Sequence, residues 1–431
     1  MSRNPKDADA LVQRARIHLS RGAPDAAEKD LQVALQYQPE SAEAHYLIAQ
    51  VHGYQKRDRL QQQELAEAIR LEPRYTTARV ALSRLLTSKD PKGALDVADS
   101  APEPQRQELA LRIQRIWPLL ELNRVEEARE GITALSSTGN SEVLLQDAVL
   151  RMRQRDCAAA RASAQKALAA NPAEVRALEL ILRCSAGEQR PGDGLEIVRR
   201  HASQNGAIAA VQMFLGRAEM QAGNRVQART AFKAARAASA GAPDADLALI
   251  DLDIAERKLD DARRRVSLLP GGSGDAAASA KLGLIEQVAG NYRAASEHYR
   301  KVLQTNPREV FVLNSLAYIL AEFIGNPAEA LPYAQAAKEL APENAAVDDT
   351  LGWTYYKMGL YPKAVRHLEL AVERGASARR HAHLAMAYAR SGNRMRAKQT
   401  LATALKLDPN LPEASLAQKV VAEAVIAARN N

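Results

Sequence analysis

Small, apolar and helix-breaking residues recur along this chain at a fixed interval. Pro5, Pro39 and Pro73 are separated by 39 − 5 = 34 and 73 − 39 = 34 residues. Between such prolines the apolar residues return on one helix face, as in VEEAREGITAL around Ala128. A period of 34 residues is that of a helix–turn–helix repeat. The pattern therefore predicts an all-α chain built from stacked pairs of helices.

Small residues also fall at fixed places inside each unit. The first unit supplies Ala15, Ala27, Ala34 and Pro39, the eleventh Gly352, Tyr355, Gly359, Ala364 and Ala371, and the last Ala385, Ala397, Ala404 and Pro409. Small side chains let neighbouring helices approach closely, glycine ends the first helix, and proline stops the second. In these residues the chain resembles the tetratricopeptide-repeat superfamily. That resemblance implies a right-handed superhelical solenoid of about twelve units.

The start of each unit can be read from the same pattern. Clear copies are predicted to begin near Ala8, Ala42, Ser141, Ala209, Ala276, Val310, Ala345 and Ala378, and weaker copies near Thr76, Glu108, Val175 and Pro243. Residues 411–431 lack a second helix. Leu416, Val420 and Ala424 are spaced four apart there, which predicts an amphipathic helix that caps the last repeat.

Two features bear on domain organisation. The sequence LPGGSGD, with Gly271, Gly272 and Gly274, is the most flexible predicted connector. We therefore predict an N-terminal array over residues 1–270 with degenerate middle repeats, a C-terminal array over 276–410 and a capping helix over 411–431. Asn4-Pro5 looks like the tail of a unit whose helices are missing. Either the chain has no N-terminal cap or the native protein extends further at its N-terminus, and we expect the second.

Composition narrows the class of protein. Aromatic residues make up 4% and hydrophobic residues 46% of the chain, which is typical of closely packed helices. Lys and Arg exceed Asp and Glu by 59 − 51 = 8. This favours acidic partners in general, but the excess is spread along the chain as on an ordinary solvated surface. Cys157 and Cys184 are too few for a disulfide framework or a zinc cage. They could pair across neighbouring helices, and free thiols are favoured.

The sequence does not decide the cellular compartment of the protein. The sequence contains no apolar run long enough to span a membrane, and MSRNPKDADA has no apolar signal region. The chain is thus cytoplasmic if it begins at this methionine, and periplasmic or envelope-anchored if the native N-terminus lies further upstream.

Candidate binding residues follow from the helical geometry of the repeat. Positions 4, 7, 8 and 11 of each first helix form the core stripe, and positions 2, 5, 9 and 12 form a second stripe about a third of a turn away. In a stacked solenoid that second stripe lines the concave face. It carries Phe311, Asn314, Tyr318, Asp349, Trp353, Tyr356, Arg379 and Met386. Apolar area with a few amides and charges suits a peptide-binding groove. The alternative is that Phe311, Trp353 and Tyr356 pack between helices.

No sequence motif supports a carboxylate clamp, catalysis or metal binding. Asn314 stands where the family's carboxylate clamp has a ligand-binding residue, but the equivalent positions hold Asp349 and Ala382 and no Lys–Asn–Arg set lines up. We therefore expect no clamp for a peptide C-terminus. No nucleotide-binding, hydrolase or zinc motif occurs, and His381 and His383 would face different sides of a helix. We predict a non-enzymatic protein without cofactor or metal.

A narrower resemblance concerns the C-terminal repeats. Residues 311–359 are similar to bacterial tetratricopeptide lipoproteins linked to exosortase and exopolysaccharide loci. The matching residues are Asn314, Leu316, Ala317, Asn326, Pro327, Glu329, Ala330, Leu331, Asp349, Thr350, Leu351, Gly352 and Trp353. The resemblance implies a bacterial, envelope-associated scaffold in polysaccharide or protein export. The missing signal and lipidation cysteine depart from that family.

The expected function is a scaffold that binds a protein or peptide partner in the concave groove. One alternative is the regulatory or targeting portion of a larger enzyme. Another is an RNA-binding helical repeat, which would need Arg and Lys along the concave stripe, whereas that stripe carries aromatics, Asp349 and Asn314.

Overall fold

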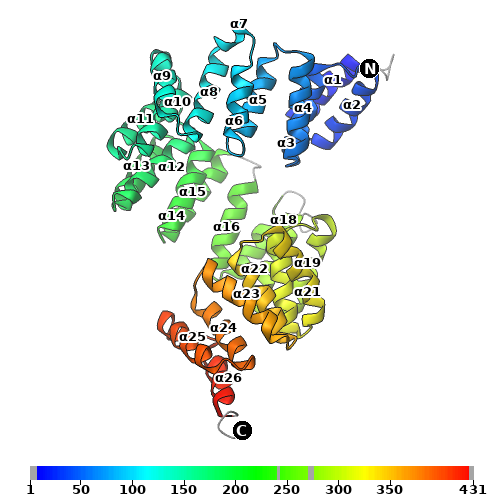
Figure 1. The fold of residues 1–431 in the computed structure, drawn as a ribbon, viewed down its shortest axis with the longest axis vertical. Helices are drawn as coiled ribbons and strands as arrows, with labels where there is room; N and C mark the ends of the chain where they lie inside the picture. The colour runs from blue at the N-terminus through cyan, green and yellow to red at the C-terminus, as the bar shows by residue number, and fades with distance from the viewer. Residues whose placement is uncertain (1–6, 240–242, 270–275, 427–431) are drawn as a thin grey trace. The chain divides into compact units, whose positions relative to one another are not determined.

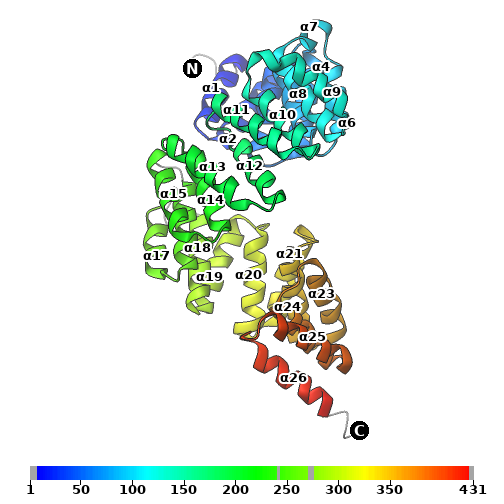
Figure 2. The ribbon, with the colours of Figure 1, turned by 90° about the vertical axis from the view of Figure 1, so that its left-hand side faces the viewer.

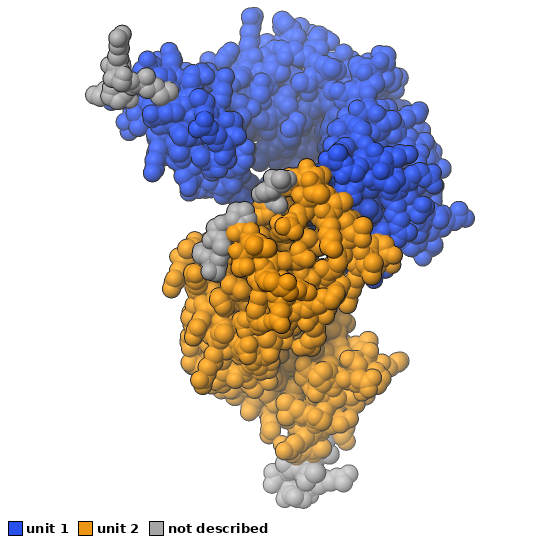
Figure 3. Space-filling view, turned by 180° about the vertical axis from the view of Figure 1, so that it is seen from behind, with its two compact units in different colours: residues 1–223 blue, residues 224–431 orange. Residues whose placement is uncertain are grey.

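The computed structural model describes residues 7–239, 243–269 and 276–426, which form α-helices joined by short turns. Within these ranges no helix is both long and apolar enough to cross a membrane. The helices fall into two compact units, Met1–Gly223 and Asn224–Asn431, coloured separately in Figure 3. Each unit is described by itself below.

The first unit contains fourteen α-helices in its described residues (Figure 1). They are α1 (Ala8–Ser20), α2 (Pro24–Tyr37), α3 (Ala42–Tyr54), α4 (Asp58–Leu71), α5 (Thr76–Leu86), α6 (Pro91–Asp99), α7 (Glu103–Arg106), α8 (Leu109–Glu121), α9 (Val125–Leu135), α10 (Ser141–Arg153), α11 (Cys157–Ala170), α12 (Val175–Gly187), α13 (Pro191–Gln204) and α14 (Ala209–Gln221).

The second unit continues the alternation, and Figure 2 shows its later helices following one another along the unit. Its helices are α15 (Arg225–Ala238), α16 (Pro243–Ala255), α17 (Leu259–Ser267), α18 (Ala276–Ala289), α19 (Tyr292–Thr305), α20 (Val310–Ile319), α21 (Pro327–Leu340), α22 (Ala345–Lys357), α23 (Tyr361–Arg374), α24 (Ala378–Arg390), α25 (Arg394–Leu407) and α26 (Ala414–Ile426). A π-helical turn, Leu320–Ile324, extends α20.

The predicted repeat starts are confirmed. Each coincides with the first residue of a first helix, except Glu108, where α8 begins one residue later at Leu109. The predicted small positions are buried as well: Ala15 and Ala385 are 0% exposed. The connector of Gly271, Gly272 and Gly274 lies outside the described residues, as does Pro5. The domain division placed at that connector stays a prediction.

Each first helix tends to end in a left-handed residue. Gly359 and Gly392 have φ of 77° and 87°, which glycine adopts without a steric penalty. Both are the fifteenth residue of their unit. Gly325, with φ of 77°, comes sixteenth because the π-helical turn adds one residue to α20. The first helices therefore keep their packing register although this unit is one residue longer.

Close contact between helices depends on these small side chains. A Cβ added at Gly352 on α22 would lie 2.7 Å from Leu368 Cγ on α23. Leu368 is itself 0% exposed, and Ala364 and Ala371 beside it on α23 are equally buried. The backbone of α22 thus lies directly against the side chains of α23, which fixes the direction in which α22 presents its other face.

A buried carboxylate also holds α22 between its neighbours. Asp348 is 0% exposed and accepts a hydrogen bond from Lys338 Nζ of α21 at 2.5 Å. It pairs on its other oxygen with Arg374 of α23. A fully buried carboxylate is stable only when it is paired in this way. Asp348 therefore fixes α22 in place one residue before the site residue Asp349.

The capping helix packs on the last repeat as expected, but one residue of its predicted face lies outside the contact. α26 lies against α24 and α25, and Ala417, Val420 and Val421 are its buried residues. Leu416, which the spacing placed on the covering face, is 48% exposed, so that part of the prediction is wrong. Val420 is buried and Ala424 packs against the same core, as predicted. Ala417 takes the place of Leu416 on the covering face, since Ala417, Val420 and Val421 follow the spacing of three and four that a helix face requires.

The two cysteines are free thiols. Cys184 is buried on α12 and contacts Cys157, and burial together with this contact raises the pKa of Cys184 to about 12. The thiol form is therefore strongly favoured at neutral pH.

Substitution of Gly352 tests the close packing of α22 on α23. Gly352→Leu should lower the free energy of unfolding of the C-terminal repeats by roughly 2–3 kcal/mol, because the side chain would overpack the contact with Leu368. The chain has 2 tryptophans, so in a Trp117→Phe background the fluorescence of Trp353 reports urea unfolding of this unit. Glu373→Leu, on the exposed side of α23, is the control and should change stability by less than about 0.5 kcal/mol. An unchanged midpoint for Gly352→Leu would show that the repeat register is misassigned.

Candidate functional site: a polar groove on three consecutive first helices

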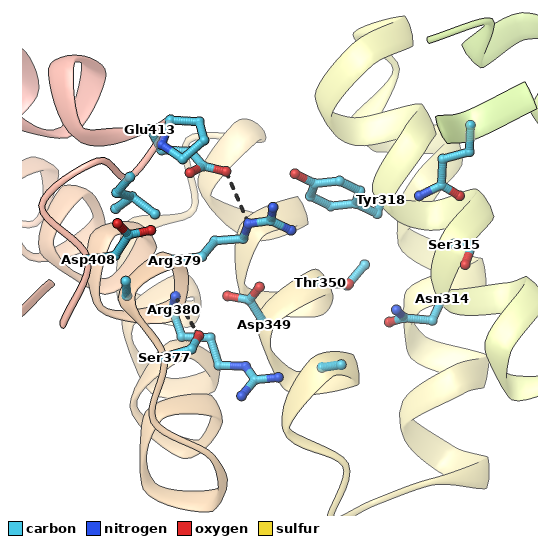
Figure 4. Close-up of a pocket in the computed structure, with 15 residues that line it drawn as sticks. Asn314, Ser315, Tyr318, Asp349, Thr350, Ser377, Arg379, Arg380, Asp408 and Glu413 are labelled. Carbon is cyan, nitrogen blue, oxygen red and sulfur yellow. Dashed lines mark hydrogen bonds and ion pairs between the residues drawn. The ribbon is translucent and has the colours of Figure 1, made fainter. Parts of the chain in front are cut away.

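Four of the eight predicted residues line one pocket in the second unit. Asn314 and Tyr318 come from α20, Asp349 from α22 and Arg379 from α24 (Figure 4). The pocket has a volume of about 500 Å³. Its other lining residues are Gln287, Ser315, Ala346, Thr350, Ser377, Ala378, Arg380, Asp408, Leu411, Pro412 and Glu413. We call this pocket the groove.

The local sequence explains why these side chains face the groove. Asn344 and Ser377 cap the N-termini of α22 and α24 by accepting hydrogen bonds from the backbone N–H of Ala346 and Arg380. The caps set where each helix begins, and therefore which positions of its first turns lie beside the neighbouring helix. Asn314 and Asp349 occupy the equivalent fifth place of α20 and α22, as the sequence predicts.

The other four predicted residues do not line the groove. Phe311 is 48% exposed and lies edge-on to Tyr299. Trp353 and Met386 are only 2% and 1% exposed, and Tyr356 is partly buried. Trp353 and Tyr356 therefore pack between helices, which is the alternative to a binding role for them. A direct role of these four residues in binding stays a prediction.

Trp353 is the centre of an aromatic stack that joins α22 to its neighbours. Its ring stacks on His383 of α24 with a centroid distance of 4.0 Å and on Tyr356 with 4.7 Å. Its Nε1 donates a hydrogen bond to Glu322 Oε2, in the turn after α20, at 2.7 Å. Lys357 Nζ lies 5.6 Å from the indole centroid. This stack connects the three helices that form the groove.

Asp349 is held by His383, which the repeat pattern does not place on the concave stripe. His383 Nδ1 lies 2.9 Å from Asp349 Oδ1, and the two residues are 1% and 9% exposed. An ionised carboxylate can only accept, so Nδ1 must carry the proton. The pair is 34 residues apart in sequence, which is one repeat. That spacing is the only signal by which the contact could have been found.

Glu413 is the second residue that sequence reasoning missed. It precedes α26, and its Oε1 pairs with Arg379 Nε at 3.0 Å. Figure 4 shows the Arg379 guanidinium beside Glu413, with the Tyr318 hydroxyl directed towards it from α20. Because Glu413 belongs to the capping segment and not to a repeat, no repeat position could have predicted it.

Two buried oxygen atoms of the groove have no partner. Among the described residues, neither Asn314 Oδ1 nor Glu413 Oε2 makes a hydrogen bond. Both residues line the groove. A buried acceptor without a partner costs about 1–3 kcal/mol, so these atoms are places where a ligand could donate hydrogen bonds.

The tyrosine of the groove stays neutral over a wide pH range. Burial raises the pKa of Tyr318 to about 12, although the nearby Arg379 opposes this shift. The hydroxyl therefore remains protonated and able to donate a hydrogen bond at neutral pH. In the described part of the chain, no group of three or more His, Cys, Asp or Glu side chains is arranged to hold a metal ion.

The fold and the groove place the chain among helical repeat proteins. Models of the tetratricopeptide repeat match residues 12–57, 145–209, 280–345 and 378–411. The chain therefore contains tetratricopeptide repeats in these segments, as its small-residue pattern predicts. The four matched segments include α20 and α24, two of the three helices that line the groove.

Individual proteins and solved structures are similar to this chain at low identity or over part of its length. A TPR repeat-containing protein of Pseudomonas aeruginosa is 33% identical over 85 residues, which cover 20% of this chain and 14% of that protein. One chain in the crystal structure of the APC/C hetero-tetramer Cut9–Hcn1 aligns over 97% of this chain and 96% of its own length, with 16% identity and a TM-score of 0.48. Yeast Tom70 aligns over 98% and 96%, with 12% identity and a TM-score of 0.45.

Replacement of Trp353 tests whether its side chain is part of the packed core. Trp353→Ala should lower the free energy of unfolding by about 3–5 kcal/mol, because it removes a buried stack and leaves a cavity. Trp353→Phe keeps most of the stack but loses the hydrogen bond to Glu322. The loss of this hydrogen bond should lower the free energy of unfolding by about 1 kcal/mol, in addition to any effect of the changed packing. Far-ultraviolet circular dichroism during urea unfolding measures both. Wild-type stability of Trp353→Ala would contradict the observed packing.

Titration of Tyr318 tests the burial of its hydroxyl. The pKa of Tyr318 in the folded protein, about 12, lies above the value of about 10 expected in an unfolded chain. The stability contributed by Tyr318 is therefore fully present below about pH 10 and is lost as the pH rises through the folded pKa. The difference in tyrosinate absorbance between wild type and Tyr318→Phe should appear only near pH 12. A difference already complete at about pH 10 would show that the hydroxyl is exposed.

Proposed function

We propose that this chain is a non-catalytic interaction scaffold that binds an extended peptide segment of a protein partner in the groove of α20, α22 and α24. The observation that supports this most strongly is the groove itself. Three consecutive first helices contribute to it, and it contains the buried, unpartnered oxygen of Asn314. A peptide laid across three repeats would touch one helix of each.

Asn314 is suited to recognise a peptide backbone. Its side-chain amide offers both a carbonyl acceptor and an NH₂ donor, which match the N–H and C=O groups of a passing peptide. Figure 4 shows this amide directed from α20 towards α22. Because Asn314 Oδ1 has no partner among the described residues, a ligand N–H would satisfy an acceptor that is otherwise left without a hydrogen bond.

The chemistry of the groove favours binding over catalysis. Its hydroxyl groups come from Ser315, Tyr318, Thr350 and Ser377, and an activated hydroxyl nucleophile needs an adjacent base. The imidazole of His383 is 1% exposed and is bonded to Asp349. That histidine therefore serves to orient a carboxylate of the groove.

The second part of the proposal concerns the biological process in which the scaffold acts. The similarity of residues 311–359 to exosortase- and exopolysaccharide-associated lipoproteins supports a role in bacterial envelope polysaccharide or protein export. The groove lies in the repeats that carry this similarity. In the source organism, a deletion strain should lose exopolysaccharide or an exported protein. Complementation should succeed with wild type and fail with a groove-blocked variant.

A steric block of the groove tests peptide binding directly. Peptides are selected from a random displayed library on the full chain, and their affinity is measured by fluorescence anisotropy. Ala346→Phe should weaken binding by roughly tenfold or more, because Ala346 lines the groove on an exposed turn of α22. Asn314→Ala should weaken binding in the same direction through loss of the amide contacts.

The matched control is Ala328→Phe. Ala328 is the second residue of α21, as Ala346 is of α22, and it is exposed outside the groove. This variant should bind as wild type does. Equal affinity for wild type and Ala346→Phe, or an equal loss with Ala328→Phe, would overturn a binding site in the groove.

A further inference from the structure

The two cysteines of this chain lie beside each other on consecutive helices of the first unit. Cys157 is the first residue of α11, and Cys184 lies in the last turns of α12, which packs against α11. Both belong to one apolar cluster, in which Cys184 is a core residue and Cys157 packs against the core. The side chain of Cys157 also contacts the Cys184 thiol directly. The fold thus brings together two thiols that are 184 − 157 = 27 residues apart in sequence.

The two thiols differ in their access to solvent. Cys184 is 1% exposed, whereas Cys157 is partly exposed. Burial, together with the contact with Cys157, raises the pKa of Cys184 to about 12, so that its thiol is protonated at neutral pH. A dissolved reagent therefore reaches Cys157 first, and Cys184 is reached only through Cys157.

An arginine lies beside the two thiols and joins the same two helices. Arg161, one turn after Cys157 on α11, pairs through its guanidinium with Glu188 at the end of α12 at 2.5 Å. Arg161 is also close enough to Cys157 and Cys184 to interact with both electrostatically. A cation at this place attracts the thiolate, which is the form in which a cysteine attacks a disulfide.

The place of Cys157 in its helix allows the two sulfur atoms to approach further. Asp156 caps α11 by accepting a hydrogen bond from the backbone N–H of Ala159. Cys157 follows this cap, and the backbone N–H of a first helical residue has no partner within its own helix. A small shift of Cys157 therefore disturbs fewer backbone hydrogen bonds than the same shift in the middle of a helix.

We propose that Cys157 and Cys184 form a site of reversible oxidation, at which a low-molecular-weight disulfide such as oxidised glutathione converts the two thiols into an internal disulfide. Cys157 is the thiol that reacts with the dissolved disulfide. Cys184 is the thiol that closes the internal bond. This site lies in the first unit and does not depend on the groove or on its proposed function.

The reaction consists of two thiol–disulfide exchanges. Cys157 loses its proton and attacks one sulfur of glutathione disulfide, whose sulfur–sulfur bond breaks, and the other half leaves and takes up a proton. Cys184 then loses its proton and attacks the Cys157 sulfur of the mixed disulfide, which releases the second glutathione as a thiol. The protein gives up two electrons and two protons, and glutathione disulfide receives them. Excess reduced glutathione drives the same steps in reverse.

The bond would join two successive repeats. α11 is the second helix of the unit that begins at Ser141, and α12 is the first helix of the unit that begins at Val175. A cross-link over 184 − 157 = 27 residues restricts the unfolded chain, which favours the folded state if the native geometry accepts the bond. Oxidation should therefore stabilise the contact between these repeats.

Equilibration of the folded full chain with mixtures of reduced and oxidised glutathione tests this proposal. Each sample is quenched with acid, and its intact mass and its remaining thiols are measured after denaturation and alkylation. As the share of oxidised glutathione rises, the monomer should lose the mass of two hydrogen atoms and both alkylation sites together. Dithiothreitol should restore both thiols.

Single substitutions assign the two steps. Cys184→Ser should stop at the mixed disulfide and gain the mass of one bound glutathione at Cys157. Cys157→Ser leaves only the buried thiol of Cys184 and should gain no glutathione in the folded protein. The main measurement needs neither variant, because the wild-type chain contains no other cysteine.

Urea unfolding shows whether the bond fits the native fold. In a Trp353→Phe background the fluorescence of Trp117, which packs against the same cluster, reports the first unit. Oxidation should lower the unfolding equilibrium constant of this unit on the order of 100-fold, as expected for a closed loop of this length. An unchanged or lower midpoint in urea would show that the bond strains the fold and would overturn a native site.

Three results of the glutathione experiment would also overturn the proposal. The first is two free thiols in the wild-type chain under an excess of oxidised glutathione. The second is a mixed disulfide at Cys157 that does not proceed to an internal bond. The third is a disulfide-linked dimer as the main product. Peptide binding in the groove would stand in each case, because the groove belongs to the second unit.

Discussion

The close approach of neighbouring helices at small side chains is the constraint on which this structure depends. Where Gly352 lies against Leu368, a single added Cβ would come within 2.7 Å of the leucine side chain. Such contacts leave little freedom in the rotation or the axial position of one helix on the next. Because each first helix is fixed on its core side, the face that it presents to a ligand is fixed as well.

The groove follows from that constraint together with two polar anchors. Asp348 holds α22 to α21 and α23 through Lys338 and Arg374. The stack of His383 on Trp353 joins α24 to α22. The side chains of the groove are thus presented by rigid helices, which lowers the entropy that a ligand must overcome on binding. Among the described residues, Asn314 Oδ1 and Glu413 Oε2 are oxygens of the groove that this arrangement leaves without a hydrogen bond.

Most of the fold could be predicted because the repeat rule is local. Alanine, glycine and proline at fixed places define where helices start, stop and touch, and the observed starts agree with the predicted ones. The π-helical turn after α20 was not predicted, since it changes the length of one unit and keeps the register of the next. On α26, Val420 and Ala424 lie on the covering face as predicted, but Leu416 does not, because apolar spacing alone did not decide between Leu416 and Ala417.

The site was predictable only in part, for a physical reason. Asn314, Tyr318, Asp349 and Arg379 lie on the predicted stripe and meet in the groove. Trp353 shares that stripe but is buried, since a large ring can turn into the contact with α24. Glu413 belongs to the capping segment, and His383 sits one place beyond the stripe. Neither contact follows from repeat positions, because each depends on how one element packs on another.

Hydrogen–deuterium exchange of the full chain with and without a selected peptide tests the central claim most directly. The account predicts slower exchange on binding in the segments that contain α20, α22, α24 and the turn at Glu413, and no change in α10 to α13. Protection confined to other helices, or no protection at a saturating concentration of peptide, would contradict a binding groove on these three helices.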